Sequence, residues 1–250
     1  MTGNLAPSPR SAKLLWLSLL TLLAVIILVG LGSWQWQRLA WKEGLIQKIE
    51  SRATGPERSL SEIQTLWQRD RDVEYYRIRV RGVFDYTKEL HFYTVENGRP
   101  GWRIVVPLTL PDAFLIFVDR GFVPLELKSA KARAEGQISG AVDISGIVRG
   151  YKQERGLFVP VNDLAKNEWY WRSYLEMSEA SLEPAKRDKV RPFLIESDDL
   201  KLAGGWPRGG VTRLSLSNRH LQYALTWWGL ALTLIAVYGV FVRGQLRKTN

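Results

Sequence analysis

Two long apolar runs lie near opposite ends of the chain. The first extends from Leu14 to about Ser33 without a charged residue, and the second from about Leu221 to Val242. At a rise of about 1.5 Å per residue, each can cross a hydrocarbon layer about 30 Å thick as a helix. The first run is too long for a cleavable signal peptide, so we interpret it as a retained anchor. The predicted organisation is a tail at 1–13, a transmembrane helix at 14–36, an extramembrane domain at 37–219, a second transmembrane helix at 220–242 and a tail at 243–250.

Between these runs the apolar pattern changes to the alternation that is typical of strands. From Tyr75 to Phe84, apolar residues alternate with a row of arginines, Arg77, Arg79 and Arg81, which predicts a strand with one buried face. Similar short runs lie at 89–95, 102–108, 114–119 and 142–148, with turn-forming residues at 97–101 and a piece at 191–196 that closes the sheet. We expect a membrane-anchored α+β protein, in which the two transmembrane helices flank an antiparallel sheet or barrel-like domain with short helical insertions.

Two further segments interrupt the sheet pattern. The basic segment 126–135 is predicted to form a helix inserted between strands. The segment 204–210 is too rich in glycine and proline for regular structure, and we expect it to act as the hinge back to the membrane. Asp119-Arg120 is interpreted as the end of a strand, and Asp198-Asp199 as a solvated turn.

The composition excludes most catalytic and metal chemistry. The 250-residue chain has no cysteine and only two histidines, His91 and His220. It therefore lacks a disulfide framework, a cysteine nucleophile and a thiolate metal site. It carries no serine-hydrolase, phosphate-loop or zinc-protease motif, so we expect no enzyme activity. The formal net charge of +10 comes without a nucleic-acid-binding signature, and we expect no nucleic acid partner.

His220 stands where a polar stretch becomes the second apolar run, and aromatic residues follow it. A neutral imidazole backed by aromatic rings suits an axial ligand for an apolar metal macrocycle, because its nitrogen supplies the metal bond and the rings supply stacking area. The alternative is that His220 only marks the membrane interface. His91 lies in the predicted strand 89–95 on the same face as Glu89, and we interpret it as an ordinary surface histidine.

A set of short motifs follows in a fixed order along nearly the whole chain. They are Gly32-Ser33-Trp34-Gln35-Trp36-Gln37-Arg38 with Trp41-Lys42, Asp119-Arg120-Gly121-Phe122-Val123-Pro124, Val159-Pro160-Val161-Asn162, Trp169-Tyr170, Gly204-Gly205-Trp206-Pro207, and finally Asn218, His220-Leu221, Tyr223-Ala224 and Thr226-Trp227. Together with the two spans, this set resembles the Surfeit locus protein 1 family, the membrane-anchored assembly factors of haem-copper cytochrome c oxidases. Arg219 departs from the family pattern, in which a second asparagine precedes the histidine.

The resemblance implies a two-pass protein of a bacterial inner membrane, with both termini in the cytoplasm and the central domain in the periplasm. The absence of an evident Arg-rich and Ser-rich transit peptide favours the bacterial setting over the mitochondrial one. The resemblance further implies binding of haem A, with His220 as the metal ligand, and delivery of that cofactor to the catalytic subunit of cytochrome c oxidase. The implied partners are this catalytic subunit, haem A synthase and membrane lipid.

The residues around the spans predict where haem A would lie. On one helix, His220, Tyr223 and Trp227 share a face. On the other, antiparallel packing would bring Trp34 and Arg38 to about the depth of His220. We therefore expect a cleft between the helices, in which the macrocycle stacks on Trp34 or Trp227.

The arginines leave two readings open. Arg38 or Arg219 would lie near the haem propionates in the expected cleft, although Arg38 would also serve as an interfacial anchor beside Trp34. The alternative function is a scaffold that stabilises an oxidase assembly intermediate without binding a cofactor. The row formed by Arg77, Arg79 and Arg81 would then offer a surface for an acidic partner, or it would be an ordinary solvated strand face.

Overall fold

The computed structural model describes residues 9–151, 154–210 and 218–247. The outer parts of the two predicted tails, and residues 152–153 and 211–217 of the predicted 37–219 domain, lie outside the described residues. The chain forms two compact units. Met1–Lys48 and Ser215–Asn250 make a helix pair, and Ile49–Leu214 make a sheet domain. These units do not define the membrane limits predicted at 14, 36, 220 and 242, which remain predictions.

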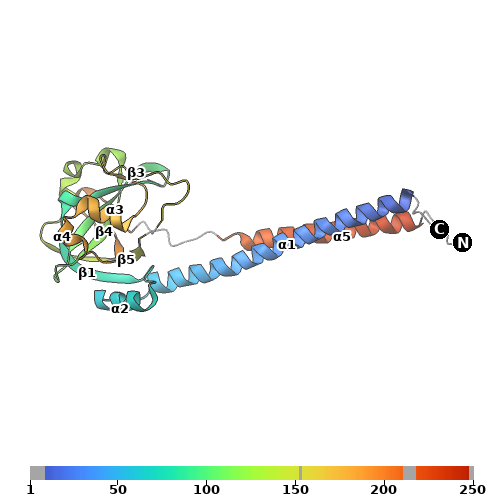
Figure 1. Ribbon diagram of the computed structural model, residues 1–250, viewed down its shortest axis with the longest axis horizontal. Helices are drawn as coiled ribbons and strands as arrows, with labels where there is room; N and C mark the ends of the chain where they lie inside the picture. The colour runs from blue at the N-terminus through green and yellow to red at the C-terminus, as the bar shows by residue number, and fades with distance from the viewer. Residues whose placement is uncertain (1–8, 152–153, 211–217, 248–250) are drawn as a thin grey trace. The chain divides into compact units, whose positions relative to one another are not determined.

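The helix pair consists of α1 (Pro9–Ala53) and α5 (His220–Arg247), which lie alongside each other (Figure 1). Both helices are long and apolar enough to cross a membrane, which indicates that the chain is membrane-anchored. Helix α1 continues without a break past residue 36, as the apolar period after the first run predicts. Asn218 lies just before α5, and its side-chain oxygen accepts a hydrogen bond of 3.4 Å from the backbone N–H of His220, the first residue of the helix.

The sheet domain is built on seven strands in the order β1-β5-β7-β4-β3-β2-β6. They are β1 (Arg77–Phe84), β2 (Leu90–Glu96), β3 (Arg99–Thr109), β4 (Leu115–Pro124), β5 (Ala141–Gly150), β6 (Glu168–Trp169) and β7 (Phe193–Ser197). The predicted α+β class with flanking apolar helices is confirmed. The sheet is mixed rather than purely antiparallel, because β4 pairs with β7 and β2 pairs with β6 in parallel.

The sheet curls back on itself without closing completely. The end of β1 pairs with β3 through Val83–Thr109 and Phe84–Leu108, although β5, β7 and β4 separate these strands along the other path. The last strand in sequence, β7, lies between β5 and β4. The segment predicted to close the sheet therefore occupies its middle, and the barrel-like description holds only in part.

Strand β4 forms the centre of the packing, because both of its faces are covered. Ile116 and Val118 point into one apolar cluster with Ile78 and Val80 of β1, whose alternating burial confirms the predicted one-sided strand. Leu115 and Phe117 belong to a second cluster that contains Trp169 and Met177. A strand buried on both faces reads as a continuous apolar run, as residues 115–118 of β4 do.

Short helices cover the two clusters. They are α2 (Leu60–Asp70), α3 (Tyr174–Ser181) and α4 (Pro184–Arg187), with 3-10 turns η1 (Tyr86–Lys88), η2 (Leu125–Leu127), η3 (Ala130–Gly136) and η4 (Ala203–Gly205). Helix α2 begins with a capping box, in which Ser59 and Glu62 each accept a backbone N–H of the other. Its apolar face buries Ile63 in the first cluster, and Met177 of α3 is buried in the second.

Two segments differ from the local predictions. The basic segment 126–135 is not an α-helix but falls in the 3-10 turns η2 and η3, and η3 is kinked where Arg133 leaves helical geometry (φ −136°, ψ 37°). The side chain of Arg133 is buried and pairs with Glu89, and this tertiary contact replaces a continued helix. The turn predicted at 97–101 spans only Asn97 and Gly98, both with positive φ, as in a type I′ hairpin.

The segment 204–210 is not a free hinge. Phe122 of β4 and Arg208 exchange backbone hydrogen bonds of 2.9 and 3.0 Å, so the segment lies fixed against β4. Gly121 makes this approach possible, because a Cβ at its position would lie 1.9 Å from the Arg208 carbonyl oxygen. Residues 211–217, which lead back to α5, are outside the described part of the chain.

Asp119 and Arg120 do not lie at an exposed strand end. They stand within β4, where Asp119 is completely buried and Arg120 is almost so. The Asp119 carboxylate accepts hydrogen bonds from Arg103 (2.6 Å) and Arg172 (2.7 Å), and Arg172 also pairs with Glu196 (2.8 Å). Burial by itself would lower the pKa of Arg103, but the nearby Asp119 carboxylate raises that pKa above its ordinary value. These ion pairs therefore belong to the interior of the sheet domain.

His91 is not an ordinary surface histidine. Its side chain is 12% exposed, and Nε2 donates a hydrogen bond of 2.7 Å to Oε1 of Glu89, which also pairs with Arg133. Burial alone would raise the pKa of Glu89, but the hydrogen bonds from His91 and Arg133 lower it overall. His91 is thus part of a buried charged cluster in the sheet domain.

The arginine row of β1 is compensated within the chain. Arg77 pairs with Asp198, Arg79 Nε lies 2.9 Å from Glu57, and Arg81 lies 3.9 Å from Asp143. The row is therefore not a strip of uncompensated positive charge, and the feature that motivated the scaffold alternative is weakened.

Candidate functional site

The candidate site lies in the helix pair, where His220 meets α1. His220 is half-buried, and its Nδ1 lies 2.7 Å from Oε1 of Gln35. A carboxamide oxygen only accepts hydrogen bonds, so Nδ1 must carry the proton. The lone pair of the neutral ring is then on Nε2, which makes no hydrogen bond to any residue that the structure describes. In the neutral imidazole, this arrangement leaves Nε2 as the nitrogen that is able to bind a metal.

Helices α1 and α5 approach each other closely at Gly32 and Trp228. A Cβ at Gly32 would lie 2.3 Å from the indole nitrogen of Trp228, so only glycine admits this ring against α1. Trp228 also contacts Trp36, with ring centroids 6.0 Å apart. Ala224 and Ala231 are the buried residues of α5, and small residues are typical of closely packed membrane helices. The position of His220 is therefore fixed by packing along one side of α5.

The far ends of the same helices are also joined. The hydroxyls of Ser18 and Tyr238 lie 2.5 Å apart. Contacts of residue 35 with 220, 32 with 228 and 18 with 238 require antiparallel helices. The antiparallel packing expected from the sequence is confirmed, and it brings the 34–38 segment level with His220.

The other residues that were predicted for the site differ in how exposed their side chains are. Trp227 is half-buried, whereas Trp34 and Tyr223 are 51% and 52% exposed. Arg38 is exposed and lies 4.6 Å over the ring of Trp41, and Arg219 is exposed at the start of α5. None of these five side chains has a polar contact with His220, and the direct partner is Gln35.

Gln35 is a residue of the site that the sequence patterns did not predict. It stands between Trp34 and Trp36 in an interfacial segment, where a polar side chain is unremarkable. The available signal was that Gln35 directly follows Trp34, which was predicted as a site residue. Which side of α1 faces α5 is known only from the packing of the two helices. The sequence thus located the segment and not the residue that orients the imidazole.

A metal at this site would rely on a single protein ligand. Among the described residues, no group of three or more His, Asp or Glu side chains is arranged to hold a bare ion. Metal-binding histidines characteristically donate their other N–H to an oxygen acceptor, as His220 does to Gln35. The donor set therefore fits an ion that is already held by a macrocycle and takes one imidazole as axial ligand.

Comparison with known proteins assigns this chain to a family. A model of the SURF1 family matches residues 22–232. The chain belongs to the SURF1 family. Within that family it is 35% identical over 242 residues to Surfeit locus protein 1 of Homo sapiens, which covers 89% of this chain and 77% of the human protein.

Two more relatives show the range of the SURF1 family. Surfeit locus protein 1 of Xenopus tropicalis is 33% identical over 245 residues, covering 91% of this chain and 76% of that protein. A SURF1-like protein of Rickettsia felis is 27% identical over 233 residues, covering 92% and 98% of the two chains. The family resemblance expected from the ordered motifs is confirmed.

Proposed function

We propose that this SURF1-family protein is a non-enzymatic assembly factor that binds haem A through His220 and assists its insertion into the catalytic subunit of a haem-copper cytochrome c oxidase. The observation that carries the proposal is the hydrogen bond from Nδ1 of His220 to Gln35, which leaves Nε2 with a lone pair. The family membership supports the oxidase setting.

The chain's own residues would hold the cofactor in a defined way. Haem A would supply a porphyrin-bound iron that accepts one axial nitrogen. Gln35 would keep the imidazole in one tautomer and orientation, while Trp227 offers a half-buried indole on the same side of α5. Tyr223, Trp34, Arg38 and Arg219 are proposed as outer contacts, because the first two expose aromatic surface and the arginines carry charge that suits propionates.

The proposed location is a bacterial inner membrane. The two apolar helices support a two-pass anchor. The proposed orientation, which the family resemblance implies, has both termini in the cytoplasm and the sheet domain in the periplasm. In that setting the proposed partners are haem A synthase as donor, the oxidase catalytic subunit as receiver, and the surrounding lipid.

Pigment measurements on purified protein test the proposal. The full chain is co-expressed with haem A synthase, purified in detergent and scanned for haem absorption. The wild type is expected to carry haem A, and His220→Ala is expected to lose most of it. His91→Gln is the matched control, because it changes the only other histidine of the chain, which lies in the sheet domain. Equal haem content in wild type and His220→Ala would remove His220 from the site.

The same samples separate cofactor delivery from the scaffold alternative. Each preparation is also probed for co-purified oxidase catalytic subunit. A colourless wild type that still retains this subunit would favour a scaffold. A pigmented wild type whose His220→Ala variant loses pigment but retains the subunit would place both activities in one protein.

A further inference from the structure

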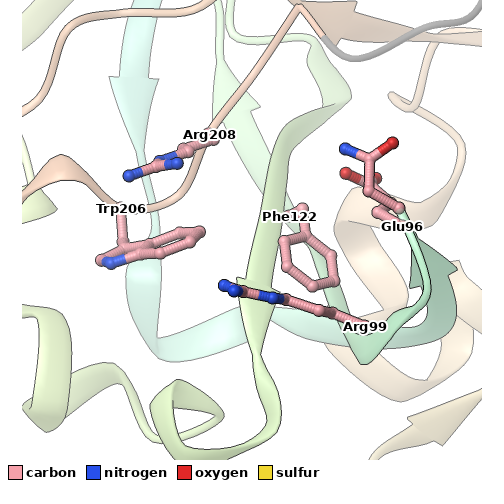
Figure 2. A pocket seen from close by; sticks show the side chains of 6 residues that line it. Glu96, Arg99, Phe122, Trp206 and Arg208 are labelled. Carbon is pink, nitrogen blue, oxygen red and sulfur yellow. The ribbon is translucent and has the colours of Figure 1, made fainter.

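The sheet domain carries a cavity of about 350 Å³ that the proposed haem site does not use. Its lining consists of Glu96, Asn97, Arg99, Phe122, Trp206 and Arg208. The volume is within the range of about 300–1,000 Å³ that is usual for small-molecule sites. The cavity lies between the β2–β3 turn, strand β4 and the segment after η4 (Figure 2). Three stretches that are distant in sequence therefore combine to form it.

The walls of the cavity are fixed in place. Phe122 and Arg208 exchange two backbone hydrogen bonds, and the rings of Phe122 and Trp206 meet edge to face with centroids 6.2 Å apart. A side chain at Gly121 would collide with the Arg208 carbonyl, so the backbone of this wall has little freedom to shift. A preformed aromatic wall reduces the ordering cost of binding a flat, apolar group.

Two guanidinium groups face this aromatic wall. Figure 2 shows Arg99 reaching below Phe122 toward Trp206, and Arg208 lying over Trp206, at 4.3 Å from its ring centroid. Neither arginine forms an ion pair with a carboxylate of the described residues. A guanidinium stacked on an indole keeps its edge N–H groups available for a planar anion.

The remaining charge in the cavity selects the type of anion. Glu96 is held by Arg103, whose Nη1 lies 2.9 Å from the Glu96 carboxylate. Arg103 also pairs with Asp119 and therefore compensates Glu96 only in part, so Glu96 beside Arg99 and Arg208 leaves a site with a modest net positive charge. Such a site suits the single charge of a carboxylate better than the double charge of a phosphate, because Glu96 repels the second charge.

We propose that this cavity is a binding site for a small planar organic anion, in which an aromatic ring lies against Trp206 and Phe122 and a carboxylate is bound by Arg99 and Arg208. The confined volume favours a small molecule over an extended acidic peptide. The site is independent of His220, so it stands or falls separately from the proposed haem function.

Equilibrium dialysis with the full chain in lipid nanodiscs tests the proposal. The probe is 2-naphthoate, which carries one carboxylate on a planar ring, and empty nanodiscs correct for uptake by lipid. Saturable binding is expected for the wild type, with a loss of at least about tenfold in affinity for Arg99→Gln or Arg208→Gln. Arg81→Gln is the matched control, because Arg81 is an exposed arginine of the same domain and its removal changes the net charge equally. Unchanged thermal midpoints establish that each variant is folded.

Trp206→Leu provides a second test that does not alter charge, and it is expected to weaken binding of 2-naphthoate more than binding of cyclohexanecarboxylate. Binding that survives both pocket arginine variants, or that falls equally in Arg81→Gln, would overturn the proposal. Equally tight binding of cyclohexanecarboxylate to the wild type would refute a planar ligand. Displacement of the probe by an equal concentration of inorganic phosphate, or tighter binding of a tetraglutamate peptide, would assign the cavity to another class of ligand.

Discussion

The carboxamide oxygen of Gln35 in α1 lies 2.7 Å from Nδ1 of His220 in α5 and links the two helices, although the two residues are 185 positions apart in sequence. This contact sets the tautomer of the imidazole, since the amide oxygen offers no proton. The function proposed for His220 therefore depends on a residue of the other helix.

Gln35→Leu is expected to lower haem affinity by about 10–100-fold, because it removes the acceptor that orients the imidazole. Haem titration followed by absorption measures the change. Gln35→Glu keeps an oxygen acceptor and should restore most of the affinity. Gln37→Leu is the control, because Gln37 is exposed on the same helix. Wild-type affinity in Gln35→Leu would show that the contact has no role in binding.

Gly32→Val should separate α1 from α5. The added side chain would occupy the space of the Trp228 indole, and overpacking of this kind costs about 1–3 kcal/mol. The thermal midpoint of the detergent-solubilised chain is expected to fall. Gly30→Val is the matched control, because a Cβ at Gly30 meets nothing within 4 Å. Equal midpoints for the two variants would contradict the close approach at Gly32.

Asp119→Asn should destabilise the sheet domain by about 3 kcal/mol, because it removes the buried carboxylate that the half-buried Arg103 and Arg172 share. The loss is at the lower end for a broken buried ion pair, since each arginine keeps one other carboxylate partner. Urea unfolding monitored by tryptophan fluorescence measures the loss. Asp143→Asn breaks only the 3.9 Å pair with Arg81 at the surface, and it should cost less than about 1 kcal/mol. A small effect of Asp119→Asn would mean that the interior tolerates the two positive charges.

The buried Glu89 should make the stability of the sheet domain depend on acid pH. Its pKa is lowered in the folded state, so its ion pairs stabilise the fold fully above the ordinary glutamate pKa of 4.5, and this contribution disappears as the pH falls through the lower, folded-state value. Urea unfolding between pH 6 and pH 3, a range of about three units around that pKa, is expected to show a smaller loss of stability on acidification for Glu89→Gln than for wild type. Glu183→Gln, which changes an exposed carboxylate, should follow the wild-type curve. Parallel curves for wild type and Glu89→Gln would exclude Glu89 as the source of the dependence.

Local sequence patterns predicted the elements whose shape depends on their own residues. The two apolar runs and the alternation of β1 are of this kind, because burial of one face follows directly from the spacing of apolar side chains. The extension of α1 beyond the first span was predicted for the same reason.

Long-range contacts decided the features that sequence patterns could not give. Arg133 breaks the predicted helix at 126–135 because Glu89, 44 positions away, draws its side chain inward. The central place of β7 and the fixing of 204–210 on β4 likewise depend on pairings between distant segments. For the candidate site, the sequence predicted His220, which stays a prediction, whereas the contact of His220 with Gln35 emerged only from the packing of the two helices.

The ion pairs around Asp119 also affect how variants of this protein should be assayed. Substitutions that weaken this interior would raise the fraction of unfolded chain, which cellular proteases remove, so a change of a few kcal/mol lowers protein abundance several-fold. A strain carrying such a variant would then lack oxidase because it contains too few copies of the factor, even if each folded copy worked normally. Immunoblots that count those copies must therefore accompany any respiratory phenotype attributed to residues of β4.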